Sequence, residues 1–238
     1  MATQCTFLTW AVVLGWCLRA GSLLAQTPDP YALLARAKAR QALVQDFYAE
    51  VAIAVDVDFL RVPVKKAEVF YQQPDTWHFK AKGFVLLPKK SVKFSVAAYL
   101  EGPVSAFYVT SALMDQTQVE VVKILPLAAD SELLLATLWI DRTTAVLRHV
   151  EAHTRSAGTY QVHFIYATAP FDLPVQTVLT FEISRMQLPL KYLGRLKINP
   201  QKLGDKAQGT VTLTFTNFKV NEGMAATGFA PEELRSLE

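Results

Sequence analysis

The chain has 238 residues, of which 51% are hydrophobic and 19% are charged, and its formal net charge is +3. This length allows one sizeable domain or two small ones, and the apolar fraction excludes an intrinsically disordered chain. The basic residues are scattered along the sequence and do not form a stripe, so the composition gives no support for nucleic-acid binding.

Residues 1–25 have the pattern of a secretory signal peptide. Their apolar run, from Phe7 to Leu18, is shorter than the roughly 20 helical residues that span a bilayer, and small residues follow it up to Ala25. No Lys or Arg precedes the run, which is unusual for such a leader. We expect cleavage after Ala25 and export of the remaining chain to the periplasm.

The two cysteines of the sequence, Cys5 and Cys17, both lie inside this leader. A chain that starts at Gln26 then has no thiol, which excludes a disulfide, a thiolate nucleophile and a Cys-based zinc site. Chains without cysteine are common among proteins that are exported to an oxidising periplasm. The absence of cysteine after Ala25 therefore agrees with the predicted export.

The segment from Tyr31 to Gln45 predicts a helix, because it is rich in Ala, Leu, Lys, Arg and Gln. Asp29 can cap this helix, and Pro30 suits its first turn. One face is apolar and the other is basic: Leu33, Leu34, Ala37, Gln41 and Val44 oppose Arg36, Lys38 and Arg40. We interpret the segment as a helix packed on a core, with a helix lying on a membrane surface as the alternative.

From Phe47 the hydrophobic period changes to two, and the alternation continues to Phe59. The apolar positions are Phe47, Ala49, Val51, Ile53, Val55, Val57 and Phe59. A strand over this whole segment would reach about 43 Å, far beyond the typical length of about five or six residues. Such a strand predicts a strongly curved sheet.

The segment VKKAEVFYQQPDTWHFKA predicts two strands joined by a turn around Pro74 and Asp75. Further strands are expected at Lys93–Tyr99, Ser105–Thr110, Val119–Leu125, Leu133–Ile140, Val146–Thr154, Tyr160–Thr168, Val175–Ser184 and Gly209–Val220. The helical stretches that βαβ units need between strands are missing. The sequence therefore predicts an antiparallel, meandering sheet.

Residues 26–238 show no linker run, low-complexity segment or repeat, so we expect one domain. The region from Arg185 to Gln208 has mixed character and is expected to be a long loop or to carry short helices. Long loops in compact domains are often lids over a binding site.

His149, Glu151 and His153 would all point to one side of the strand Val146–Thr154, and their side-chain types bind zinc. Positions i and i+4 of a strand are about 13 Å apart, too far for both histidines to share one ion. A solvated strand face is therefore the better interpretation, and the same holds for His78 and His163. We expect no metal site.

Motifs of catalysis are missing from the sequence. There is no G-x-S-x-G to present a serine nucleophile, no phosphate loop and no G-x-G-x-x-G. Asp56 and Asp58 share a strand face, but that face has the pattern of an outer surface. We expect no enzyme activity, and a secreted hydrolase on a β-scaffold is the least favoured interpretation.

The strand Leu133–Ile140 is apolar on both faces. One face carries Leu133, Leu135, Thr137 and Trp139, and the other carries Leu134, Ala136, Leu138 and Ile140. A central strand of a sandwich has this pattern, and so does a sheet that curves around an apolar hollow and is partly covered outside.

The order of these elements resembles that of the periplasmic lipoprotein-carrier (LolA/LolB-like) superfamily. AEVFYQQPDTWHFKAKG is similar to its strand-Pro-strand hairpin, and ATLWIDRTTAVLRHVEAHT to its two strands joined by an Asp-containing turn. VTLTFTNFKVNEGMAATGF is similar to the closing strand and Asn-containing tail of outer-membrane lipoprotein-sorting proteins. The resemblance runs from Ala42 to Phe229.

The resemblance implies a mainly β (α+β) fold: a strongly curved, unclosed antiparallel half-barrel, with an N-terminal helix and lid-like helices or loops over an apolar cavity. Members of the superfamily carry or sense acyl chains, so it also implies a binding protein without cofactor. Gln73 stands where carriers often have an Arg before the hairpin Pro, so a lid latch built on that Arg is not transferred. We expect GFVLLPKKS and Arg185–Gln208 to replace the usual lids.

The expected function is to hold acyl chains of a lipid or lipoprotein, for transport or sorting to the outer membrane. The protein would be a monomer with inner- or outer-membrane partner proteins and no nucleic-acid partner. A regulatory or envelope-stress sensor of the same fold, with a membrane-bound signalling partner, is the alternative. The expected cavity lining consists of Val51, Ile53, Val55, Val57, Phe59, Phe70, Trp77, Phe79, Leu135 and Trp139.

Overall fold

The computed structural model describes residues 27–57, 60–61, 63–74, 76–81, 96–100, 102–156, 158–167, 173–184 and 206–223. The predicted leader, the GFVLLPKKS segment and most of the predicted loop Arg185–Gln208 lie outside these residues. The last three residues of that predicted loop belong to the final strand, which begins at Lys206.

The predicted helix is present as α1, which spans Pro30–Gln41. The side chain of Asp29 caps it by accepting a hydrogen bond from the Tyr31 amide at 3.0 Å. Its buried residues are Leu33, Leu34 and Ala37, as the apolar stripe predicted. The helix therefore packs on the core through the predicted face and leaves its basic face outward.

Among the described residues, eleven strands and one short 3-10 helix follow α1. The strands are β1 Asp46–Val57, β2 Leu60–Arg61, β3 Lys65–Gln72, β4 Thr76–Ala81, β5 Val104–Met114, β6 Thr117–Pro126, β7 Leu133–Asp141, β8 Leu147–Thr154, β9 Thr159–Tyr166, β10 Pro174–Ser184 and β11 Lys206–Val220. The 3-10 helix, η1, spans Val96–Tyr99.

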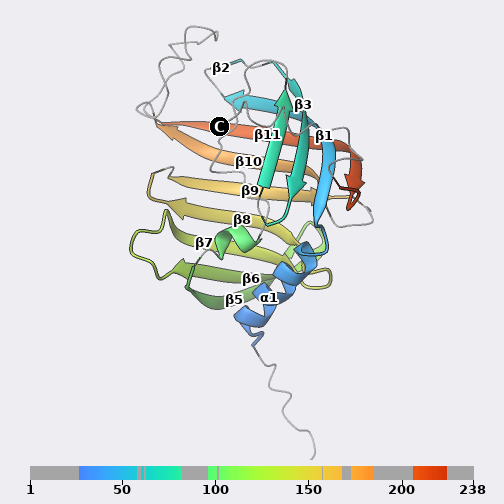
Figure 1. The fold of residues 1–238 in the computed structure, drawn as a ribbon. Helices are drawn as coiled ribbons and strands as arrows, with labels where there is room; N and C mark the ends of the chain where they lie inside the picture. Colours follow the sequence, from blue (N-terminus) through green and yellow to red (C-terminus); the bar gives the residue numbers. More distant parts are fainter. Residues whose placement is uncertain are drawn as a thin grey trace, which may run out of the picture.

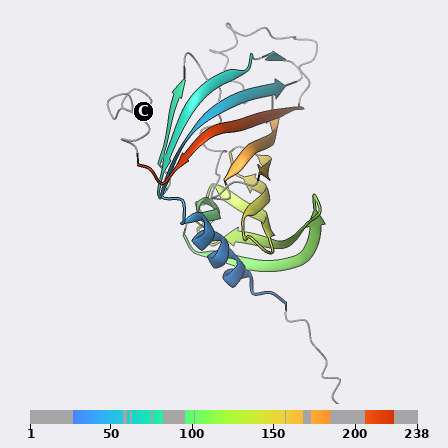
Figure 2. The ribbon, with the colours of Figure 1, turned by 90° about the vertical axis from the view of Figure 1, so that its right-hand side faces the viewer.

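The strands form one antiparallel sheet in the order β4-β3-β1-β11-β10-β9-β8-β7-β6-β5, with β2 paired to β1. The first and last long strands are neighbours, because Val51 pairs with Phe215 and Val55 with Val211. Among the described strands β4 and β5 are the two ends of the sheet and do not pair with each other, so the half-barrel is unclosed. Figures 1 and 2 show the strong bend of this sheet, with α1 and η1 on its concave side.

The predicted strand Lys93–Tyr99 is wrong where the structure describes it, because Val96–Tyr99 is helical. Its apolar residues are buried, as in a strand, and a short apolar run of this kind carries no period that separates the two structures. A long-range contact holds the segment in place: the Val96 amide donates to the side-chain oxygen of Gln41 in α1 at 2.8 Å.

Candidate functional site

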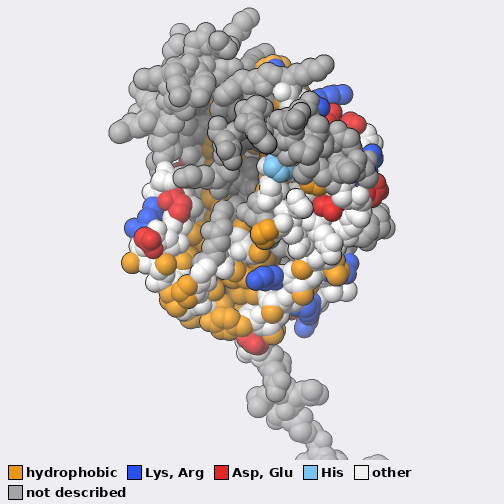
Figure 3. All heavy atoms as spheres, in the orientation of Figure 1, with side chains coloured by type: hydrophobic (Ala, Val, Ile, Leu, Met, Phe, Trp, Pro, Cys, Tyr) orange, Lys and Arg blue, Asp and Glu red, His pale blue; other side chains and the backbone are white. Residues whose placement is uncertain are grey.

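The concave face of the sheet is the candidate site, because it is almost wholly apolar. Every second residue of the long strands points to this face, where α1 and η1 also pack. Its lining beyond β1 includes Val122, Ile124, Leu138, Ile140, Val150, Val162, Phe164, Leu179, Val211, Leu213 and Phe215. Figure 3 views the molecule from this side, and hydrophobic side chains line the described part of a hollow near its middle.

Six of the predicted lining residues lie on this face. In β1, Val51, Ile53, Val55 and Val57 are buried members of the core. Trp77 and Phe79 of β4 are half-buried against the same core, with their ring centroids 6.2 Å apart. Phe59 lies outside the described residues.

Three of the predicted lining residues lie instead on the opposite face of the sheet. Phe70 lies across from Tyr48 in β1 and stacks on His78, while its neighbours Val69 and Tyr71 point to the concave side. Leu135 and Trp139 lie across from His153 and His149 of β8. The apolar cluster on the concave face instead includes Ala136, Leu138 and Ile140 of β7.

The polar side chains of Tyr99, Tyr160 and Thr177 on the concave face were not predicted. The Tyr99 hydroxyl hydrogen-bonds to Tyr160, and burial raises the pKa of both phenols. Thr177 of β10 is 1% exposed, and its hydroxyl has no hydrogen-bond partner among the described residues. Its cross-strand neighbours are Phe164 and Leu213, so this hydroxyl is surrounded by apolar side chains.

The segment that follows α1 is held by two side chains that are distant in sequence, Gln73 from the β3–β4 turn and Asn221 from just after β11. The Gln73 amide nitrogen donates to the carbonyl oxygens of Ala42 and Val44, at 3.0 and 2.7 Å. Asn221 accepts from the Gln45 amide at 2.8 Å and donates to the Leu43 carbonyl oxygen at 2.9 Å. The link between α1 and β1 is thus fixed to the hairpin β3–β4 on one side and to the end of β11 on the other.

The rest of α1 is held to the sheet by fewer polar contacts in the part of the chain described. The Tyr31 hydroxyl accepts from the Ala106 amide of β5 at 3.2 Å. The Arg36 guanidinium donates to the carbonyl oxygen of Arg142 in the β7–β8 turn. The helix also rests on apolar packing through Leu33, Leu34 and Ala37.

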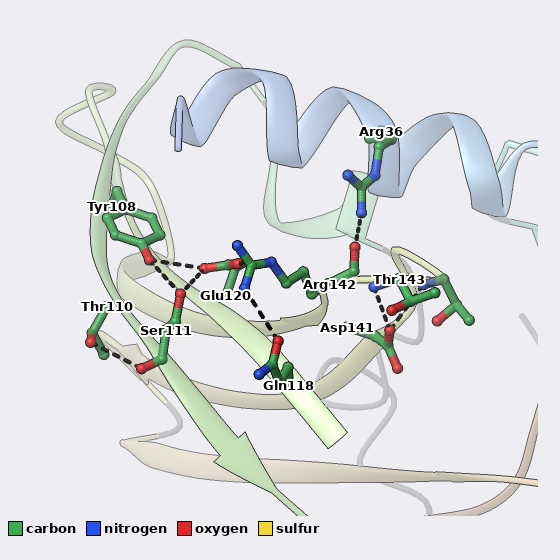
Figure 4. Close-up of polar contacts among 10 residues, drawn as sticks. Arg36, Tyr108, Thr110, Ser111, Gln118, Glu120, Asp141, Arg142 and Thr143 are labelled. Carbon is green, nitrogen blue, oxygen red and sulfur yellow. Dashed lines mark hydrogen bonds and ion pairs between the residues drawn. The ribbon is translucent and has the colours of Figure 1, made fainter. Parts of the chain in front are cut away.

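A buried carboxylate, that of Glu120, lies beside Arg142, whose backbone carbonyl accepts from Arg36 (Figure 4). Glu120 is 2% exposed and accepts hydrogen bonds from the hydroxyls of Tyr108 and Ser111, at 2.9 and 2.7 Å. Arg142 completes its shell with an ion pair at 3.1 Å. Because this carboxylate is paired on all these sides, it fixes the β5–β6 hairpin and the β7–β8 turn relative to each other.

The predicted Asp-containing turn between β7 and β8 is present. Asp141 accepts from the amides of Thr143 and Thr144, both at 2.9 Å, and pairs with Arg148 at 2.9 Å. Burial raises the pKa of Asp141, but these hydrogen bonds lower it by a larger amount. The pKa of Asp141 is therefore below its ordinary value. Asp141 thus holds the turn together through its hydrogen bonds and its ion pair.

The histidines lie on the outer face of the sheet, as predicted, but that face is not uniformly wet. His149 packs edge-on against Trp139, with ring centroids 4.7 Å apart, and lies directly opposite His163. Burial and the nearby His163 lower the pKa of His149. His153 pairs with Glu151 at 3.2 Å. Within the described ranges no three His, Cys, Asp or Glu side chains are placed to hold a metal ion.

The unclosed antiparallel sheet, with one N-terminal helix packed on its concave face, defines the class of fold. No protein-family model and no curated protein matches the chain. A solved LolA superfamily protein from Nitrosomonas europaea superposes with a TM-score of 0.55 at 9% identity, over 87% of this chain and 100% of that chain.

Two other solved structures give the same result. A putative outer membrane lipoprotein-sorting protein domain from Vibrio parahaemolyticus has a TM-score of 0.54 at 11% identity, over 87% of this chain and 100% of that chain. A DUF1329 family protein from Desulfovibrio piger has a TM-score of 0.54 at 9% identity, with the same coverage. The chain therefore has the LolA-like fold that the sequence resemblance implied.

Among the described residues, no helix has both the length and the apolar character needed to cross a membrane. What the site offers chemically is apolar surface with few hydrogen-bonding groups, and this surface suits the binding of a hydrocarbon chain.

Proposed function

We propose that the protein is a periplasmic binding protein that holds the acyl chains of a lipid or lipoprotein against the concave face of its sheet. Transport or sorting of this cargo toward the outer membrane is the proposed role. The observation that carries the proposal is the largely apolar concave face that runs across the sheet from β1 to β6, with α1 and η1 packed on it. The fold shared with a lipoprotein-sorting domain supports it.

An acyl chain that leaves water for an apolar site gains about 0.8 kcal/mol per methylene, so a closed site would release its cargo very slowly. A carrier therefore needs a cover that moves. We propose α1 as this cover, with its hinge at residues 42–46, where Gln73 and Asn221 hold the chain. The contacts of Tyr31 and Arg36 would break when the helix swings out.

The remaining parts of the proposal concern the whole chain. Residues 1–25 would be removed as a signal peptide, and residues 26–238 would form the single binding domain. The protein would act as a monomer with donor and acceptor proteins in the inner or outer membrane, and it would need no cofactor and catalyse no reaction.

A titration with a fluorescent fatty acid tests the proposal with a matched pair of variants. Val55→Asp places a charge on the concave face, whereas Leu135→Asp places one on the outer face. We expect Val55→Asp to abolish binding and Leu135→Asp to bind like the wild type. Circular dichroism of both variants separates lost binding from lost fold.

Because Val55→Asp can itself unfold the protein, Val55→Thr is measured beside it. This change replaces one methyl group of the side chain by a hydroxyl of similar size. The fold should therefore persist, while the affinity for the fatty acid falls because a polar group is placed in the apolar face. Equal binding by the wild type, a folded Val55→Asp and Val55→Thr would exclude the concave face as the site.

A further inference from the structure

The outward side of α1 is basic. Arg36, Lys38 and Arg40 are all exposed, and the sequence from Pro30 to Gln45 contains no Asp or Glu. Two large apolar side chains are exposed at the ends of the helix: Tyr31 in the first turn at 53% and Leu43, just after the last turn, at 57%. Basic residues next to exposed apolar ones are typical of helices that rest on an anionic membrane surface.

The strand beside α1 extends this surface. β5 is the last described strand of the sheet, and its 11 residues include no charged side chain. Phe107 is 55% exposed and Val109 is 48% exposed. The hydrogen bond between the Tyr31 hydroxyl and the Ala106 amide joins α1 directly to this strand. We call the outward side of α1 together with β5 the α1–β5 edge.

Two of the described acidic side chains near the α1–β5 edge, Glu120 and Asp29, have partners within the protein. Glu120 is buried and paired with Arg142, whose side chain is itself 56% exposed. Asp29 accepts the capping hydrogen bond of α1. Figure 3 shows hydrophobic side chains over β5 and basic ones over α1 in the lower part of the view.

We propose that the α1–β5 edge docks on the surface of an anionic phospholipid bilayer. Lysine and arginine side chains are attracted to phosphate head groups, while Phe107, Val109 and Leu43 enter the boundary between head groups and acyl chains. A second copy of the chain would bring the same positive charge against this edge and would be repelled by it, whereas anionic head groups are attracted. The inference extends the proposed function, because docking there would bring the proposed cover α1 against the membrane that supplies or receives the cargo.

Co-sedimentation with vesicles tests this inference on protein purified from a periplasmic extract. We expect binding to vesicles of equimolar phosphatidylethanolamine and phosphatidylglycerol, weak binding to phosphatidylcholine alone, and a loss of binding as salt is raised. Lys38→Gln combined with Arg40→Gln should weaken binding to the anionic vesicles about tenfold. The double variant leaves Arg36 and its contact with the β7–β8 turn in place.

The matched control is Lys66→Gln combined with Lys219→Gln, which removes two exposed charges from β3 and β11 at the other end of the sheet. This control should bind anionic vesicles like the wild type. Phe107→Ser combined with Val109→Ser should reduce binding and leave its salt dependence unchanged.

Equal loss in the α1 and control double variants would overturn the inference, and so would equal binding to neutral and anionic vesicles. A dimer that forms through β5 in solution, without vesicle binding, would also overturn it. The fatty-acid titration distinguishes this failure from a failure of the proposed function, because Lys38 and Arg40 lie outside the concave face.

Discussion

The two faces of strand β7 differ in what they contact, although both are apolar in sequence. On the concave face Ala136, Leu138 and Ile140 are completely buried among aliphatic side chains. On the outer face Leu135 and Trp139 lie opposite histidines of β8 and are only half-buried. Apolar character alone therefore does not identify the concave face of a bent sheet, whereas the residues across from each position in the neighbouring strand do.

The largest difference between the faces should appear in stability. Leu138→Ala leaves a cavity in a fully packed region and should lower the free energy of unfolding by about 3 kcal/mol. Leu135→Ala removes a half-buried side chain and should lower it by about 1 kcal/mol. Urea denaturation of both variants measures the contrast, and equal losses would contradict the assignment of the faces.

Asp141 on the outer face should contribute less than Leu138. Asp141→Asn leaves Arg148 without its charged partner and should cost about 2 kcal/mol near neutral pH. Since the folded-state pKa of Asp141 lies below its ordinary value of 3.8, its stabilisation is present above that value. It is lost as pH falls through the folded-state pKa, so wild type and variant should converge in acid. Urea denaturation at several pH values measures both stabilities. A constant difference in the free energy of unfolding between wild type and variant at all pH values would show that the charge of Asp141 does not cause the difference.

Substitution of Thr177 on the concave face should stabilise the protein, whereas the preceding substitutions destabilise it. Its hydroxyl is buried without a partner among the described residues, so Thr177→Val should raise the free energy of unfolding of the empty protein by about 1 kcal/mol. The same variant should weaken binding of a ligand whose polar head reaches this hydroxyl. Thermal unfolding with and without fatty acid measures both, and a destabilised empty protein would mean that the hydroxyl has a partner.

His149 should give the smallest effect. Its pKa is below the ordinary value of 6.5 because of burial, so the unfolded chain takes up a proton at this position at a higher pH than the folded protein does. Stability should therefore decline as pH is lowered from about 6.5, and His149→Gln should flatten this decline. An unchanged slope in the variant would place the pH dependence elsewhere on the outer face.

Much of the fold follows from local pattern. Three features that have a short-range physical cause were predicted at the positions where they occur. They are the alternating pattern of β1, the turn around Pro74 between β3 and β4, and the turn at Asp141 between β7 and β8. The face of the sheet on which each side chain lies was harder to predict. Val69, Phe70 and Tyr71, for example, are three consecutive apolar residues, and their pattern does not show which of them point to the core.

The contacts that hold the segment after α1 could not be predicted from the sequence. Asn221 and Gln45 are 176 residues apart, and Gln73 and Val44 are 29 apart, so no local pattern connects them. The contacts of the buried Glu120 could not be predicted either, because its partners come from β5 and from the β7–β8 turn. Such contacts depend on how the sheet bends, which only the whole structure specifies.

Native mass spectrometry of the protein purified from an envelope extract tests the central claim most directly. The account predicts a fraction of the protein with added mass, and lipid analysis of the released material should identify acyl chains. Val55→Asp should lack the added mass, and Leu135→Asp should keep it. A folded wild-type protein that carries no lipid, and takes up none when acyl ligands are supplied, would contradict the account.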